Sequence, residues 1–102
     1  MRRGELWLAN VGGKKRPVLL LTRSEVLDVR SLVTVAEVTT SVRGLAAEVE
    51  VDNNEVGLNR PSVINCDGLH TIAQASLTGP IGRVSDDIMQ KTCSAINYAL
   101  GC

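Results

Sequence analysis

Apolar and polar positions alternate in short runs over most of the chain, and turn-forming residues separate the runs. Period-two alternation of this kind is typical of half-buried β-strands. One run, Val18 to Leu21, is apolar throughout, which is the pattern of a strand buried on both faces. The pattern predicts strands over residues 5–10, 17–21, 32–38, 46–51, 62–67, 69–73 and 81–84.

Glycine and proline set the expected boundaries of these strands. Gly12-Gly13 predicts a tight hairpin between the first two. Pro17 cannot donate a ladder hydrogen bond, so the second strand is expected to begin at that residue. Asp67-Gly68 favours a turn after the fifth strand, although the carboxylate of Asp67 could instead orient an arginine or accept a proton. Gly79-Pro80 is expected to separate the last two strands.

The C-terminal segment changes to the helical period of an amphipathic helix. Ser85 is placed to cap its N-terminus and Gly101 to end it. The stripe that this helix would bury comprises Ile88, Met89, Thr92, Ala95, Ile96, Ala99 and Leu100. Residues 1–102 are therefore expected to form a single, mainly β domain, a small and strongly bent β-barrel closed by a C-terminal α-helix.

Composition adds further constraints. Trp7 and Tyr98 are the only aromatic residues, so the core must be aliphatic. The three cysteines are odd in number and give no disulfide framework, which fits a reducing cytoplasm. The N-terminal residues contain no long apolar segment, so neither a signal peptide nor a membrane span is expected. One histidine near Cys66 is too small a donor set for a metal site, and no metal or other cofactor is expected.

Charge is balanced overall but unevenly distributed. Up to Arg43 there are eight basic residues against four acidic ones, and after it seven acidic against three basic. This asymmetry could give a localised anion-binding face, or the charges could intermix on folding. The densest basic cluster, Lys14-Lys15-Arg16, directly precedes the most apolar strand. It is either a solvated turn or a phosphate-contacting tip whose Arg16 guanidinium is mounted on a rigid strand.

Further polar residues follow other predicted strand ends. The hydroxyls of Thr39, Thr40 and Ser41 can donate to phosphate oxygens, or they can satisfy the backbone of a turn. Asn65 and Asp67 form the polar end of the fifth strand. Because strand ends can converge in a small barrel, these side chains and the basic cluster are candidates for one shared site.

Short motifs follow one another in a distinctive order and spacing along nearly the whole chain. They are Arg3-Gly4-Glu5-Leu6-Trp7, Arg16-Pro17-Val18-Leu19-Leu20-Leu21-Thr22, Val38-Thr39-Thr40, Gly57-Leu58, Ser62-Val63, Cys66-Asp67, Thr71-Ile72 and Gly82. The set resembles the MazF/PemK (Kid) family of toxin endoribonucleases. The resemblance implies an SH3-like barrel with a C-terminal helix, a symmetric homodimer, and a cognate antitoxin that covers the active groove. It also implies cleavage of single-stranded RNA at short preferred sequences without a metal.

The same resemblance assigns roles to individual residues. The arginine before the family's proline falls on Arg16, and the catalytic threonine after the third strand falls on Thr39. Asp67 matches an acidic residue that some members place near the substrate, and it completes the predicted catalytic set. The arginine that certain members carry two positions earlier is Asn65 here. The predicted substrate-binding residues are Lys14, Lys15, Thr40, Ser41 and Asn65.

These residue types suit RNA cleavage on chemical grounds. RNA carries its own nucleophile, the ribose 2′-hydroxyl, so cleavage requires a proton acceptor, stabilisation of a dianionic phosphorane and protonation of the departing 5′-oxygen. Arg16 could clamp the phosphorane, Thr39 could donate to a non-bridging oxygen, and Asp67 could be the base or hold the arginine. The products would be a 2′,3′-cyclic phosphate and a 5′-hydroxyl. The alternative hypothesis is a non-catalytic interaction toxin on the same barrel, such as a CcdB-type gyrase poison.

Overall fold

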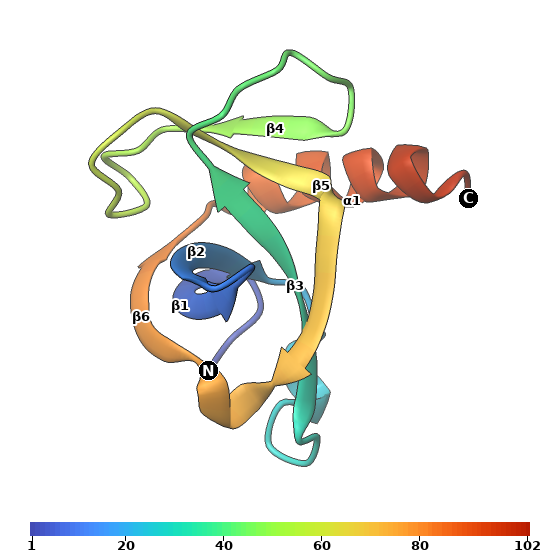
Figure 1. The fold of residues 1–102 in the computed structure, drawn as a ribbon. Coiled ribbons are helices and arrows are strands. Elements are labelled where there is room, and N and C mark those ends of the chain that lie inside the picture. The colour runs from blue at the N-terminus through green and yellow to red at the C-terminus, as the bar shows by residue number, and fades with distance from the viewer.

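The computed structural model describes all residues from Met1 to Cys102 and shows one curled β-sheet with a single α-helix at the C-terminus (Figure 1). Two single turns of 3-10 helix, η1 (Ser24–Val26) and η2 (Gln74–Ser76), connect strands. The remaining elements are β1 (Glu5–Val11), β2 (Lys14–Leu20), β3 (Leu32–Thr39), β4 (Glu48–Val51), β5 (Ser62–Ala73), β6 (Thr78–Arg83) and α1 (Asp86–Leu100). The predicted mainly β fold with a C-terminal helix is confirmed.

The sheet has the strand order β4-β5-β3-β2-β1-β6, and its paired strands run antiparallel. Its curl makes a half-barrel, with β4 and β6 as the two edges. The segment after β4 closes the remaining gap. Gly57 packs on the backbone of Ile81, and Gly82 packs on the backbone of Val56, too closely for either glycine to carry a Cβ. Backbone packing against a loop therefore replaces the last ladder of a fully closed barrel.

β2 carries an apolar core on each of its faces. Leu19 belongs to a cluster between the sheet and α1, whereas Val18 and Leu20 belong to a second cluster with Val33 and Val35 of β3. Val18, Leu19 and Leu20 are all completely buried, which confirms the prediction for these residues, whereas Leu21, the last of the apolar run, follows the end of β2 and is half-buried. Fully burying one such side chain stabilises a fold by roughly 1.5–3 kcal/mol, so β2 is a rigid support for the residues that precede it.

β2 begins at Lys14, so the prediction that it begins at Pro17 is wrong. The hairpin at Gly12-Gly13 is confirmed, with φ angles of 61° and 80° that suit glycine at both turn positions. Lys14 to Pro17 pair only with β1, because β3 joins β2 from Val18 onward. A proline is tolerated in a strand that has one free edge, and the three cations are thereby ordered as part of a strand.

The two predicted strands 62–67 and 69–73 are one strand, β5, and the predicted turn at Asp67-Gly68 is wrong. On β3, Glu37 pairs with Asn65, whereas the adjacent Ala36 pairs with Leu69. Residues 66–68 therefore have no partner on β3 and form a bulge that bends β5. The Asn65 side-chain oxygen accepts a hydrogen bond from the Asp67 backbone N–H (3.1 Å), so the polar residues satisfy the bulge instead of ending the strand.

The last two elements follow their predicted chemistry with one change. Gly79-Pro80 lies within the edge strand β6, not between strands as predicted. Ser85 Oγ accepts a hydrogen bond from the Ile88 N–H (3.2 Å), and Gly101 ends α1 at a φ of 72°, as expected for the two caps. No helix combines the length and the apolar character that crossing a membrane requires.

Candidate active site

Two adjoining hollows open where β2 and β3 separate. The ladder between these strands ends at the pair Val18 and Glu37. Arg16, two residues before Val18, and Thr39, two residues after Glu37, line both hollows. The first, the basic hollow (about 480 Å³), also contains Lys14, Lys15, Thr40 and Arg60. The second, the bulge hollow (about 380 Å³), also contains Glu37, Ser41, Asn65 and Asp67.

All eight residues that the sequence assigned to catalysis or substrate binding line one of these hollows. They come from the beginning of β2, the end of β3 and the middle of β5, which are far apart in the chain. The structure therefore brings the predicted set together, and Arg16 and Thr39 connect its two halves. The role of each residue remains a prediction.

Arg16 is a half-buried residue, and its guanidinium forms no ion pair with any carboxylate of the chain. Its backbone pairs with Ala9 of β1, and the completely buried Val18 lies two residues away. An arginine that is held by a rigid strand and has no internal counter-ion can bind an external anion through two parallel N–H donors. The site is thus suited to a phosphate.

The Thr39 hydroxyl can fill both roles that the sequence left open, donation to a phosphate oxygen and support of a turn. Its oxygen accepts a hydrogen bond from the Ser41 backbone N–H (3.1 Å), as in a local hydroxyl turn. A hydroxyl that accepts in this way still carries its own proton. Thr39 can therefore stabilise the turn and donate into the hollows at the same time.

Three carboxylates line the bulge hollow, and they differ in how they are satisfied. Glu48 accepts backbone N–H groups from Arg43 (3.0 Å), Gly44 (2.9 Å) and Leu45 (3.3 Å), so it anchors this loop. Asp67 is exposed, and its side chain accepts no hydrogen bond. The side chain of Glu37 is mostly covered. Neither Glu37 nor Asp67 accepts a hydrogen bond from the chain, and His70 Nε2 lies 3.6 Å from Glu37 Oε1.

Sequence reasoning missed Glu37 and Arg60. Arg60 belongs to the connector after β4, which bends back because the Leu58 N–H donates to the Asn53 carbonyl (2.8 Å) and Val56 is buried against β6. In the sequence, Glu37 is one polar position in an alternating strand. Its place two residues before Thr39, on the same face of β3, was the signal that could have identified it.

Cys66 adjoins Asp67 but is not a nucleophile. Burial, followed by the negative charge of Asp67 and by Cys93, raises the pKa of its thiol to about 11. Its sulfur points toward the Thr92 carbonyl of α1 (3.9 Å), away from the bulge hollow. A neutral buried thiol of this kind is inert, so Cys66 is a core residue beneath the site.

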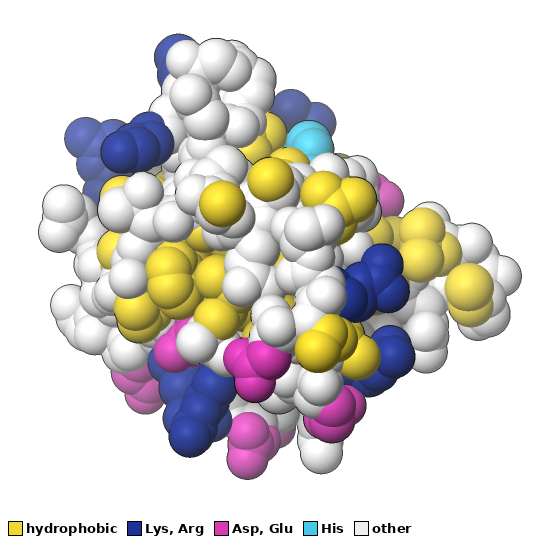
Figure 2. Space-filling model, turned by 90° about the horizontal axis from the view of Figure 1, so that it is seen from below, with side chains coloured by type: hydrophobic (Ala, Val, Ile, Leu, Met, Phe, Trp, Pro, Cys, Tyr) yellow, Lys and Arg dark blue, Asp and Glu magenta, His cyan; other side chains and the backbone are white.

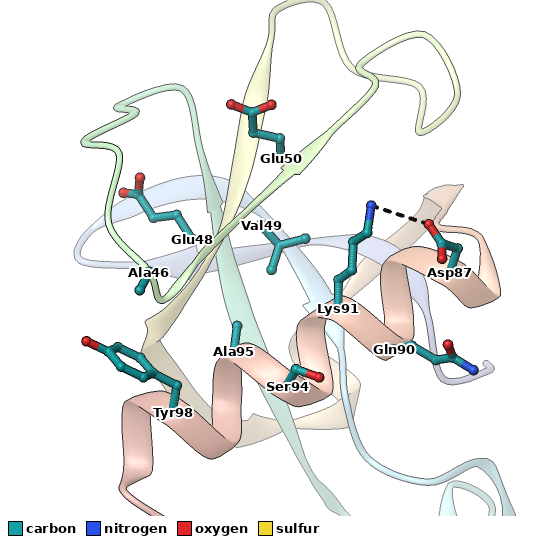
Figure 3. Close-up of a pocket in the computed structure, with 10 residues that line it drawn as sticks. All are labelled: Ala46, Glu48, Val49, Glu50, Asp87, Gln90, Lys91, Ser94, Ala95 and Tyr98. Carbon is teal, nitrogen blue, oxygen red and sulfur yellow. Dashed lines mark ion pairs between the residues drawn. The ribbon is translucent and has the colours of Figure 1, made fainter.

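A larger hollow of about 720 Å³ lies between β4 and α1 (Figure 3). In this β4–α1 hollow, Lys91 is paired with Asp87 (3.4 Å), as the dashed line in Figure 3 marks. Glu48 and Glu50 then leave an excess of negative charge. The excess disfavours a phosphate, so volume alone does not identify the site.

Comparison with known proteins agrees with this geometry. A family model described as "PemK-like, MazF-like toxin of type II toxin-antitoxin system" matches residues 2–100. The chain therefore belongs to the PemK-like, MazF-like toxin family.

Individual relatives support the same family. "Probable endoribonuclease MazF2" of Mycobacterium tuberculosis is 37% identical over 102 residues, which span 100% of both chains. The solved structure of Mycobacterium tuberculosis toxin MazF-mt6 superposes with a TM-score of 0.89 at 42% identity, over 95% of this chain and 96% of that one. A mycobacterial endoribonuclease in complex with its cognate antitoxin has a TM-score of 0.88 at 23% identity, over 99% and 95% of the chains, and shares the fold.

Proposed function

We propose that this toxin is an endoribonuclease that cleaves single-stranded RNA at short preferred sequences, with Arg16 and Thr39 at the centre of its active site. The observation that carries the proposal is the meeting of an unpaired arginine and a threonine proton donor at the junction of the two hollows. The family membership and the endoribonuclease name of the M. tuberculosis relative support it.

The proposed reaction uses the nucleophile of the substrate. The ribose 2′-hydroxyl attacks the adjacent phosphorus, the O2′–P bond forms, and the P–O5′ bond breaks. Asp67 accepts the 2′ proton or orients Arg16, which clamps the non-bridging oxygens while Thr39 donates to one of them. The 5′-oxygen takes a proton from solvent, and the products are a 2′,3′-cyclic phosphate and a 5′-hydroxyl. Arg16 offsets one of the two negative charges of the phosphorane, and the reaction is proposed to need no metal.

Substrate binding is assigned to the rim of the two hollows. Lys14 and Lys15 are exposed and directly precede Arg16, and Arg60 lines the same basic hollow. Together they give a positive path for neighbouring phosphates, which would make binding depend on salt. The remaining rim residues in the proposal are Thr40, Ser41 and Asn65.

Two protein partners belong to the proposal. The antitoxin complex of the mycobacterial relative supports a cognate antitoxin whose acidic and apolar tail covers Arg16. A homodimer is supported by a hollow of about 490 Å³ beside α1, half of whose lining residues are hydrophobic, among them Leu21, Leu32, Leu69, Ile96 and Leu100. On the face that Figure 2 shows, several groups of hydrophobic side chains lie among uncharged ones, and charged side chains lie mostly toward the edges. The three cysteines are all free, which supports a place in the reducing cytoplasm.

The test is cleavage of varied single-stranded RNAs by the purified protein, free of antitoxin and in EDTA. Fragments should carry 2′,3′-cyclic phosphate and 5′-hydroxyl ends, and Arg16→Ala should strongly reduce the rate at which they form. If all RNAs stay intact, the proposal fails. Binding to gyrase without RNA cleavage would favour the CcdB-type alternative instead.

A further inference from the structure

Glu37 and Asn65 are direct cross-strand neighbours in the bulge hollow, beside Arg16 and Thr39. Such partners lie on the same face of a sheet, with their Cβ atoms about 4.5–5.5 Å apart. Both side chains extend over Gly68, since Glu37 Oε2 and Asn65 Nδ2 are the atoms nearest to the position that a Cβ of Gly68 would occupy. The missing side chain of Gly68 therefore lets a carboxylate and an amide converge.

The orientation of the Asn65 amide is fixed by the bulge. Its Oδ1 accepts the backbone N–H of Asp67 (3.1 Å). The Nδ2 group therefore faces away from that bond with its two hydrogens available as donors. Asn65 thus presents a donor of defined direction next to the Glu37 carboxylate.

The Glu37 carboxylate lacks hydrogen-bond donors although it is largely covered. Its side chain is 22% exposed and accepts no hydrogen bond from the chain. The nearest nitrogen of a basic side chain is His70 Nε2, which lies 3.6 Å from Glu37 Oε1 and has no hydrogen-bond partner. Covering an anion without donors is costly. Donors from a ligand in the hollow would recover this cost.

The bases of RNA differ in what they offer to this pair. Single-stranded RNA is read through bases turned away from the chain, on their Watson–Crick edges. Guanine presents there two adjacent donors, N1–H and N2–H, followed by the O6 acceptor. Adenine, cytosine and uracil do not present an N–H and an amino group side by side on this edge. Two carboxylate oxygens beside one amide donor match guanine at all three atoms.

We propose that Glu37 and Asn65 form a base-reading subsite that selects a guanine beside the cleaved phosphate. Glu37 accepts N1–H and N2–H, Asn65 donates to O6, and Gly68 leaves the space in which both side chains meet. The inference rests on the proposed RNA cleavage and adds a sequence preference to it. Arg16 and Thr39 act on the phosphate, and Glu37 acts on the base.

The experiment measures cleavage of a single-stranded RNA pool with randomised positions, followed by sequencing of the new 5′ ends. Matched oligonucleotides then carry guanine, inosine, adenine, uracil or cytosine at the preferred position. Inosine lacks the N2 amino group and so removes one of the three hydrogen bonds. The proteins are the unmodified chain, Glu37→Gln and the control Glu50→Gln, which makes the same change on β4 outside both site hollows.

We expect the unmodified chain and Glu50→Gln to prefer guanine by on the order of ten- to a hundredfold in kcat/KM, and to lose part of that preference with inosine. Glu37→Gln should cleave the guanine and inosine substrates at similar rates while still cleaving RNA. Gly68→Ala, which displaces the Glu37 carboxylate without removing it, should also weaken the preference.

Two results would overturn the inference alone: RNA cleavage by the unmodified chain with no guanine preference, or full retention of that preference by Glu37→Gln. If the unmodified chain cleaves no RNA at all, the proposed function falls as well. Thermal unfolding of each variant shows whether a loss of cleavage reflects a loss of fold.

Discussion

The site hollows and the β4–α1 hollow lie on the same small barrel but differ in the state of their charges. The Arg16 guanidinium has no internal counter-ion, whereas Lys91 of the β4–α1 hollow is neutralised by Asp87. The basic hollow is smaller but contains four cations and no carboxylate, whereas the larger hollow has an excess of carboxylates. A binding function for phosphate follows from unpaired charge on rigid strands, not from volume.

Glu48 lines both the bulge hollow and the β4–α1 hollow, and it shows why a carboxylate must be judged by its partners. Its oxygens hold the backbone of residues 43–45, so they are already satisfied. Glu37, in the same bulge hollow, accepts no hydrogen bond. Two acids within one hollow thus differ in their local hydrogen bonds: Glu48 holds a loop, and Glu37 has no donor from the chain.

The largest effect should come from removing the unpaired cation. Arg16→Ala should lower kcat/KM for RNA cleavage by on the order of a hundred- to a thousandfold, because the phosphorane loses its main electrostatic partner. Arg16→Lys should recover only part of the activity, since a lysine cannot make two parallel hydrogen bonds. Initial rates on a labelled oligonucleotide give the measurement. Activity of Arg16→Ala within a few-fold of the unmodified chain would contradict the assignment.

Removing the hydroxyl opposite Arg16 should have the next largest effect. Thr39→Val keeps the shape and should reduce kcat by about a hundredfold, because one donor to the phosphorane is removed. Thr39→Ser keeps the hydroxyl and is the matched control, for which most activity should remain. Single-turnover rates separate this effect from binding. Equal rates for the two variants would show that the hydroxyl serves only the turn with Ser41.

The buried thiol of Cys66 should make the free energy of unfolding depend on pH. Cys66 has a folded-state pKa raised from 9.0 to about 11, so its neutral thiol stabilises the fold below pH 9 and the stabilisation is lost as the pH rises toward 11. The loss should be on the order of 2 kcal/mol in the free energy of unfolding, measured with urea. Cys66→Ala should flatten this decline and Cys102→Ala, at an exposed thiol, should keep it. An unchanged decline in Cys66→Ala would refute the explanation.

The exposed lysines beside Arg16 should have a smaller effect, on binding and not on chemistry. Replacing Lys14 and Lys15 together by alanine should weaken RNA binding several-fold at low salt. It should reduce the slope of log affinity against log salt by about 0.7 for each phosphate that a lysine no longer neutralises. Fluorescence titration over a range of salt concentrations measures both the affinity and the slope. An unchanged slope would place the RNA path elsewhere.

The smallest effect is expected in the β4–α1 hollow. Lys91→Met removes an exposed i,i+4 pair with Asp87, and such pairs stabilise helices by roughly 0.3–0.5 kcal/mol. RNA cleavage should stay at the level of the unmodified chain, while thermal unfolding shifts slightly. A loss of cleavage comparable to that of Arg16→Ala would show that the β4–α1 hollow is also needed for RNA cleavage.

The sequence by itself determined the local elements. The continuous apolar run specified a strand with a core on both faces, Gly12-Gly13 specified the hairpin, and Ser85 and Gly101 specified the ends of α1. These features depend on periodicity and on backbone preferences within a few residues, which a single sequence contains. The motif order, the basic cluster and the polar residues at predicted strand ends together identified eight of the residues that line the two site hollows.

Only the tertiary structure decided how β5 runs and which side chains meet. Asp67-Gly68 has the composition of a turn, but pairing with β3 and β4 makes it a bulge inside one strand. The same long-range pairing brings Glu37 to Asn65, and the loop that closes the barrel brings Arg60 to the basic hollow. Contacts between residues so distant in the chain depend on the packing of the whole sheet, and local propensity gives way to it.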